Sequence, residues 1–445
     1  MRRLLKTVFL PATFALLVSC AGEQPDAKVA KAYPGLVINE IAAHEEHKTD
    51  SWVEIMNTSS KEVSLSGLGL YATDEYLNDK CIWSSSGGSL APGERLVVTT
   101  ADETLVTSLG SYSEFTLRLG TESGSVDKFV RSRDCGFTQY KRGSYQRIPD
   151  GTGSWRNFTY NSKDKENIVF DYNAPKRTAI WTWSSHMAPL MENDAAVMKE
   201  LWRKGYRHLL LNSAAFTNRQ QECAIFMDKA EEIGFIVHGW IQAFYNGAWD
   251  LPINKETKQI REEVYTAIHE KGRVAIEDFG VKGLHLDYIR WPNKALEYNF
   301  TKDVNSVAAV NRACREVREQ CDSYDEGLVT SAALMPEKNS TNTYAQDPSL
   351  MGKYLHILMP MCYRYSYNYS DTGLVNVMNW FCDNSANAEV WSGMQTYDKS
   401  ETPLSSEAIL ADATVYAQSK ATGVVLFRFG LGTPPDMNTL YSEGY

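Results

Sequence analysis

The sequence predicts two folded parts, an all-β sandwich followed by an α/β barrel of the (β/α)8 type. A chain of 445 residues is too long for one ordinary core, so its length predicts two or three domains. Short apolar or alternating runs, broken by turn residues, fill the first part and are typical of a sandwich. Strand-like and helix-like segments then alternate eight times over about 270 residues, which is the size and period of a TIM barrel.

The composition is that of a globular protein. Hydrophobic residues make up 43% of the chain and charged residues 22%, which argues against a disordered or fibrous protein. The formal net charge of −10 argues against a nucleic-acid partner, since such a partner requires a basic surface.

The first nineteen residues have the pattern of an export signal. Arg2, Arg3 and Lys6 precede an apolar run from residue 8 to 18 that is too short to span a bilayer. Residues 17–20 resemble a bacterial lipobox, which predicts that Cys20 is lipidated; a plain secretory signal is the alternative. Residues 20–33 form a polar tether. We therefore expect a lipid-anchored protein of the cell envelope, on the outer membrane or cell surface.

Seven cysteines follow Cys20, and an odd number leaves at least one thiol unpaired. Cys81 and Cys135 are the most plausible disulfide pair because they alone share the first domain. Cys314 and Cys321 lie two turns apart on one predicted helix, too far for a bond within it. No CxxC pair or His/Cys cluster indicates zinc, so neither a metal nor a cofactor is predicted.

Residues 34–156 carry the strand pattern of the sandwich. The motifs that identify this part are residues 37–41, 52–57, 63–67, 90–94 and 144–151. Through these motifs it resembles the lamin-tail domain, an immunoglobulin-like fold, which implies an interaction or targeting module with a protein or envelope partner and no catalytic role. His44 and His47 flank two glutamates but lack the spacing of a helical metal site, so this stretch is predicted to be a solvated loop.

A polar linker is predicted over residues 157–175, and the barrel over residues 176–445. No glycine-rich phosphate loop follows its first strand, which disfavours an open doubly wound sheet. The eight predicted strands cover residues 178–183, 208–212, 235–240, 283–292, 328–333, 356–361, 389–394 and 423–428, the fourth being ended by Trp291 and Pro292.

The carboxyl ends of barrel strands carry the active site in this fold. Asp287, near the end of the fourth strand, faces the barrel, where a carboxylate is costly unless water or a ligand reaches it. Aromatic side chains at this rim are suited to stack on sugar rings, although about half of the tryptophans are expected to pack in the core. The predicted substrate-binding residues are His238, Trp240, His285, Arg290, Trp291, Tyr363, Gln395, Tyr397 and Arg428.

The stretch from Gly283 to Pro292 resembles the signature of the glycosyl hydrolase-like family ten barrels. This resemblance implies a TIM barrel over most of residues 177–430 and hydrolysis of a glycan.

Glycoside hydrolysis usually needs two carboxyl groups. Asp287 is the first, in the role of nucleophile or charge stabiliser, and Glu337 and Asp398 are the candidates for the second, with Glu337 as proton donor. The expected partner is a polysaccharide or oligosaccharide of the envelope or its surroundings. A non-catalytic glycan-binding or adhesion protein is the alternative, and a barrel deacetylase or peptidase lacks the metal cluster or Ser/His/Asp signature that it requires.

Overall fold

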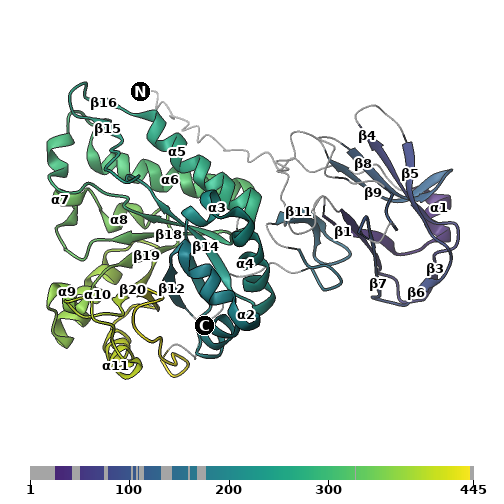
Figure 1. Ribbon diagram of the computed structural model, residues 1–445. Coiled ribbons are helices and arrows are strands. Elements are labelled where there is room, and N and C mark those ends of the chain that lie inside the picture. The colour runs from purple at the N-terminus through teal and green to yellow at the C-terminus, as the bar shows by residue number, and fades with distance from the viewer. Residues whose placement is uncertain are drawn as a thin grey trace, which may run out of the picture.

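The computed structural model describes residues 26–42, 51–74, 79–101, 104–106, 109, 115–131, 143–158, 161–167, 177–325 and 327–440. Figure 1 shows an antiparallel β part and a larger body built around a barrel. The predicted signal segment with Cys20, the stretch from His44 to His47, and Cys135 lie outside the described residues, so the predictions made for them stand untested. Within the described ranges, no helix is both long and apolar enough to cross a membrane.

The β part consists of two larger antiparallel sheets that share one hydrophobic core. One sheet has the strand order β11-β10-β1-β2-β7 and the other β5-β4-β8-β9. Ile38 and Ile55 of the first sheet lie in the same buried cluster as Leu70 and Leu117 of the second. The immunoglobulin-like topology remains a prediction. The elements are α1 (Ala27–Ala32), β1 (Leu36–Ala42), β2 (Trp52–Asn57), β3 (Val63–Ser64), β4 (Gly69–Asp74), β5 (Asp79–Ser84), β6 (Ser89–Leu90), β7 (Arg95–Thr99), β8 (Phe115–Thr121), β9 (Gly124–Arg131), β10 (Ser144–Ile148) and β11 (Ser154–Phe158).

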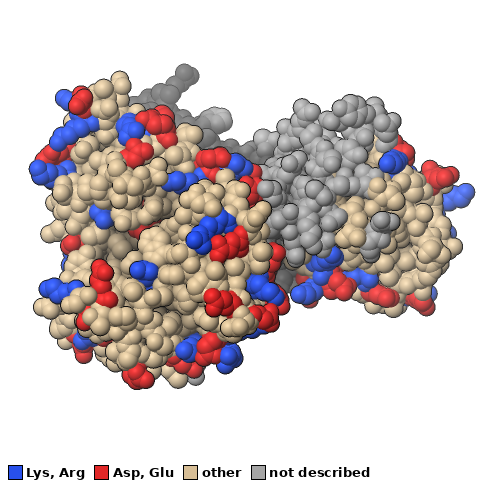
Figure 2. Space-filling view, in the orientation of Figure 1, with Lys and Arg blue, Asp and Glu red and all other residues tan. Residues whose placement is uncertain are grey.

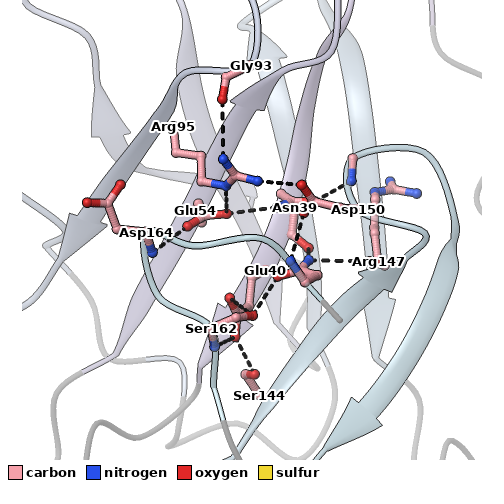
Figure 3. Close-up of polar contacts among 12 residues, drawn as sticks. Asn39, Glu40, Glu54, Gly93, Arg95, Ser144, Arg147, Asp150, Ser162 and Asp164 are labelled. Atoms are coloured by element: carbon pink, nitrogen blue, oxygen red, sulfur yellow. Dashed lines mark hydrogen bonds and ion pairs between the residues drawn. The ribbon is translucent and has the colours of Figure 1, made fainter. Parts of the chain in front are cut away.

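Two buried glutamates attach the segment 161–167 to the first sheet (Figure 3). Glu40 accepts hydrogen bonds from the Ser144 hydroxyl at 2.5 Å and from the backbone amide and hydroxyl of Ser162, both at 2.9 Å. Glu54 accepts one from the backbone amide of Asp164 at 2.8 Å. Both glutamates have no exposed surface. The chain that leads toward the barrel is therefore held to the sheet by carboxyl groups.

Glu40 makes the stability of the β part depend on pH. Burial is the main cause that raises its pKa from 4.5 to about 7, against the opposing hydrogen bonds from Ser144 and Ser162. Between these pH values the folded chain keeps a proton that the unfolded chain releases, so stability falls as pH rises through this window. Glu40→Gln cannot ionise and keeps an acceptor oxygen. We expect wild type to lose on the order of 3 kcal/mol more than Glu40→Gln between pH 4.5 and 7.5.

Denaturant unfolding of the full-length proteins at the two pH values measures this difference. If the β part and the barrel unfold in separate transitions, the one to compare is the transition that shifts in Glu40→Gln. Parallel loss of stability in wild type and Glu40→Gln would show that Glu40 does not titrate in this window.

The barrel confirms all eight predicted strands. They close in the order β12-β13-β14-β17-β18-β19-β20-β21, and all eight neighbouring pairs are parallel. The strands are β12 (Thr178–Thr182), β13 (His208–Asn212), β14 (Ile236–Gln242), β17 (Gly283–Asp287), β18 (Val329–Leu334), β19 (Ile357–Pro360), β20 (Glu389–Gln395) and β21 (Gly423–Phe427). A hairpin of β15 (Ile253–Asn254) and β16 (Gln259–Ile260) follows β14.

Helices connect the strands and surround the barrel (Figure 1). Parallel neighbours require such crossovers, because a tight hairpin joins only antiparallel strands. The helical elements are η2 (Ser184–His186), α2 (Met187–Arg203), α3 (Ala214–Asn218), α4 (Gln220–Ile233), α5 (Glu262–Arg273), η3 (Val274–Asp278), η4 (Ala295–Tyr298), α6 (Ser306–Tyr324), α7 (Ser340–Tyr344), α8 (Pro348–Met351), α9 (Arg364–Tyr367), α10 (Asp371–Asp383) and α11 (Ser406–Tyr416).

The barrel interior is filled by side chains in layers, as expected for this fold. In the lower layer His208 bonds His238 at 3.0 Å and packs its ring on Trp391. Gly283 lies beside them, because a Cβ at this position would approach His238 Nδ1 to 2.5 Å. The next layer, toward the carboxyl ends of the strands, contains His285. Because these layers fill the interior, a ligand can contact the barrel only at the strand ends.

Candidate active site at the carboxyl end of the barrel

Asp287 is the last residue of β17, and its side chain is only partly buried. Its Oδ1 accepts a hydrogen bond from the backbone amide of Tyr288 at 2.7 Å, and its Oδ2 accepts one from Trp240 Nε1 at 3.1 Å. The parallel pairing of β14 with β17 sets the second contact, since Gln242 pairs with Asp287 and Trp240 lies two residues earlier on the same face. The carboxyl group is thus fixed in orientation at the rim.

Burial raises the pKa of Asp287 above its ordinary value. The Tyr288 amide, the Trp240 indole and the nearby charge of Arg290 oppose this effect and do not cancel it. Asp287 therefore keeps its proton to a higher pH than an exposed aspartate does. A carboxyl group with this property is suited to donate a proton to a leaving group.

Aromatic rings cluster around Trp240, the side chain that donates to Asp287. Trp183, which follows β12, lies with its ring centroid 4.7 Å from that of Trp240. Phe427, at the end of β21, lies 6.4 Å from Trp240 and stacks on Tyr363 at 5.8 Å. The pKa of Tyr363 is raised by burial and by neighbouring groups that include Asp287. These rings give the site a largely apolar wall with polar edges.

Glu337 lies on the loop after β18 and is partly buried. Its Oε1 accepts a hydrogen bond from the Tyr344 hydroxyl at 3.3 Å, and its Oε2 is buried without a partner among the described residues. Arg290 packs over the same Tyr344 ring, 5.4 Å from its centroid. Because Arg290 also acts on Asp287, Glu337 belongs to the side of the rim that carries Asp287.

Asp398 serves the structure of its own loop. Its Oδ1 accepts hydrogen bonds from the backbone amides of Ser400 at 2.7 Å and Thr402 at 2.9 Å. These amides, chiefly that of Thr402, lower the pKa of Asp398. A carboxylate committed to two backbone amides is a poor proton donor, so we do not retain Asp398 as the second catalytic carboxyl group.

Three residues that the sequence predicted to bind substrate are out of its reach. His238, His285 and Trp291 have no exposed surface. His285 lies below the rim, where its ring accepts from Trp181 Nε1 at 3.2 Å and bonds Ser331 Oγ at 2.9 Å. Strand alternation places His238 and His285 on the inner face but does not specify their depth, and both fill interior layers.

Trp291 is buried for a different reason. Tyr288 has a φ of 50°, and the chain turns after β17. Trp291 then packs against the rings of Phe244 and Tyr298, with centroids 5.8 and 5.5 Å away. It supports the loop and does not face the site.

The other predicted binding residues lie at or just below the rim. Gln395 is buried and accepts from the backbone amides of Tyr365 and Ser366, both at 3.1 Å, so it positions loops. Trp240 is also buried, so it does not face the substrate as predicted; its Nε1 orients the Asp287 carboxyl group. Tyr363, Tyr397, Arg290 and Arg428 are at the rim.

The structure adds residues that the sequence did not assign to the site. Tyr288, Tyr344 and Phe427 contribute rings around the two carboxyl groups and the arginines. The only sequence signal for Tyr288 and Phe427 was their position directly beside Asp287 and Arg428. Nothing in the sequence marked Tyr344. Among the residues that the structure describes, no cluster of His, Cys, Asp or Glu has the arrangement of a metal site.

Comparison with known proteins shows only remote similarity. No protein-family model matches the chain, and no curated protein does. The spore cortex-lytic enzyme SleL of Bacillus cereus is 13% identical, covers 61% of this chain and 75% of its own, and gives a TM-score of 0.44. The β-galactosidase of Marinomonas ef1 is 9% identical over 57% of this chain and 54% of its own, with a TM-score of 0.40. A family 18 N-acetylglucosaminidase from Paenibacillus barengoltzii is 16% identical over 50% of this chain and 69% of its own, with a TM-score of 0.36.

Proposed function

We propose that the barrel hydrolyses glycosidic bonds, with Asp287 as the proton donor. The observation that carries this proposal is a partly exposed carboxyl group at the end of a barrel strand, oriented by two donors and with a raised pKa. Glu337 is the second carboxyl group, acting as base or nucleophile. These roles are the reverse of those expected from the sequence, because burial favours the protonated form of Asp287.

The surroundings of Asp287 support a sugar as the substrate. Trp183, Phe427 and Tyr363 offer aromatic faces, and the phenol of Tyr363 offers a polar edge. Such amphipathic side chains suit a partly hydrated ligand that has both apolar faces and hydroxyl groups. The predicted substrate is a polysaccharide or oligosaccharide.

Incubation of the purified full-length chain with a panel of polysaccharides tests the proposal. We expect new reducing ends from at least one glycan, in proportion to enzyme concentration. Binding without any release of reducing ends would support the alternative, a glycan-binding protein.

Trp240→Phe is expected to change the pH dependence of hydrolysis. The indole N–H stabilises the ionised form of Asp287, so its removal raises the pKa of this carboxyl group further. If Asp287 donates the proton, activity falls as pH rises through its pKa, and the alkaline limb of the pH–rate profile of kcat moves to higher pH in the variant. An unchanged alkaline limb would contradict the assignment. A phenylalanine retains most of the ring packing, so the fold should be preserved.

We further propose that the chain is exported, anchored to a membrane of the cell envelope through lipidated Cys20, and equipped with a lamin-tail-like interaction module. The support is the sequence pattern of residues 1–20 and of the β part. Cys20→Ser should move the protein from the membrane fraction to the soluble fraction of expressing cells. Equal membrane association of both forms would exclude this anchor.

A further inference from the structure

Two arginines at the rim form no direct ion pair with a described carboxylate, unlike most arginines elsewhere in the barrel. Apart from Arg207, the other described arginines of the barrel form ion pairs with Asp or Glu. Arg207 instead donates to two backbone carbonyl groups and packs on Trp202. On the face shown in Figure 2, basic and acidic side chains accordingly lie side by side over much of the barrel. For Arg290 and Arg428, no described carboxylate lies within ion-pair distance.

Arg290 is held in place by aromatic rings. Its guanidinium carbon lies 5.0 Å from the ring centroid of Trp249, 5.6 Å from that of Tyr288 and 5.4 Å from that of Tyr344. Its Nη1 donates to the backbone oxygen of Trp291 at 3.1 Å. Its remaining N–H groups donate to no described residue and can bind a ligand, and the rings reduce the entropy lost when they do.

Arg428 occupies a similar position beside β21. It follows Phe427 and packs over the Trp183 ring at 5.8 Å. Its charge contributes to the lowered pKa of His186, for which burial is the larger cause. Among the described residues, no carboxylate lies within ion-pair distance of this cation, whose neighbours are a neutral histidine and an aromatic ring.

The two arginines flank the mouth of the barrel. β17 and β21 are fourth and eighth in the closed order of strands, so they stand on opposite sides. Asp287 and Phe427 end these two strands. Arg290 therefore lies on the side of the mouth that carries Asp287 and Arg428 on the opposite side, so a glycan that spans the mouth passes both arginines.

We propose that the substrate is an acidic glycan, with Arg290 and Arg428 binding its carboxylate or sulfate groups at opposite sides of the barrel mouth. This inference rests on the proposed hydrolase function and specifies the class of its substrate. A guanidinium presents N–H groups in a fork that matches the paired oxygens of both anions. A neutral glycan would leave two cations of the site without partners.

The test measures binding separately from cleavage. Asp287→Asn is titrated calorimetrically with acidic oligosaccharides of the uronate and sulfated types, and with the same oligosaccharides after carboxyl reduction or desulfation. We expect the acidic forms to bind at least about ten-fold more tightly, because charge-assisted hydrogen bonds are roughly twice as strong as hydrogen bonds between neutral groups. The uronate and sulfate arms identify the anion. Added salt should reduce the preference.

Substitution of the arginines assigns the preference to them. The preference is the ratio of the affinities for the acidic and the neutral oligosaccharide. In the Asp287→Asn background, Arg290→Met and Arg428→Met should each lower this ratio by about ten-fold, and the double substitution should abolish the preference. Arg290→Lys should retain part of it, since the charge remains without the fork. Arg219→Met, at an exposed arginine next to α4, is the matched control and should change nothing. Thermal melting confirms that each variant is folded.

Equal affinity for acidic and neutral forms, no binding of any acidic oligosaccharide, or a preference that survives the double substitution would each overturn the inference. Cleavage by wild type distinguishes this failure from that of the proposed function. Hydrolysis of a neutral glycan without preference would leave the hydrolase in place and exclude the acidic substrate. Binding of acidic oligosaccharides without hydrolysis of any glycan would support an acidic ligand and contradict the proposed hydrolase.

Discussion

Asp287→Asn is expected to reduce kcat for glycan hydrolysis by about a hundred- to ten-thousand-fold, the range for loss of a general acid. Asparagine has nearly the same shape but has no proton of suitable acidity to donate. The side-chain oxygen of asparagine can still accept a hydrogen bond from either Tyr288 or Trp240. Its NH2 group cannot accept one, so the second of the two bonds is lost. The fold should therefore persist at a modest cost in stability, which thermal melting measures.

The leaving group distinguishes proton donation from other roles of Asp287. A dinitrophenolate departs without protonation, so the dinitrophenyl glycoside of the cleaved sugar should lose much less activity in Asp287→Asn than the natural glycan does. An equal loss on both substrates would assign Asp287 to the nucleophile or base instead. Undiminished release of reducing ends from the glycan would remove Asp287 from the mechanism.

The sequence was sufficient to predict the barrel and the position of Asp287. Alternation of strand-like and helix-like segments located all eight strands, and Asp287 was placed at the end of its strand because a carboxylate on the inner face needs access to solvent. The same alternation placed His238 and His285 on that inner face. It carries no information on depth, and the interior layers of the barrel take up both rings.

The chemistry of the carboxyl groups was less accessible from the sequence. The direction of the pKa shift of Asp287 depends on its burial and on Trp240, a residue 47 positions away along the chain. Asp398 did carry a local signal, since an aspartate in a polar loop often accepts a hydrogen bond from the backbone amide two residues later, as it does here from Ser400. Its position after a barrel strand led to a catalytic interpretation instead.

Glu337→Gln and Asp398→Asn together determine the second carboxyl group. Glu337 Oε2 is buried and bonds no described residue, so it is available to a water molecule or to the sugar. Asp398 is occupied by the amides of Ser400 and Thr402, and an asparagine oxygen can accept both bonds in its place. We therefore expect Glu337→Gln to lower kcat by about a hundred- to ten-thousand-fold and Asp398→Asn to remain within a few-fold of wild type.

The dinitrophenyl glycoside separates the two catalytic roles a second time. A base or nucleophile is needed whatever the leaving group, so Glu337→Gln should lose as much activity on this substrate as on the natural glycan, in contrast to Asp287→Asn. Near-normal activity of Glu337→Gln combined with a large loss in Asp398→Asn would make Asp398, and not Glu337, the second catalytic carboxyl group. Each substitution removes the charge of the side chain and preserves its shape. Near-normal activity of both variants would therefore mean that neither Glu337 nor Asp398 is the group that works with Asp287.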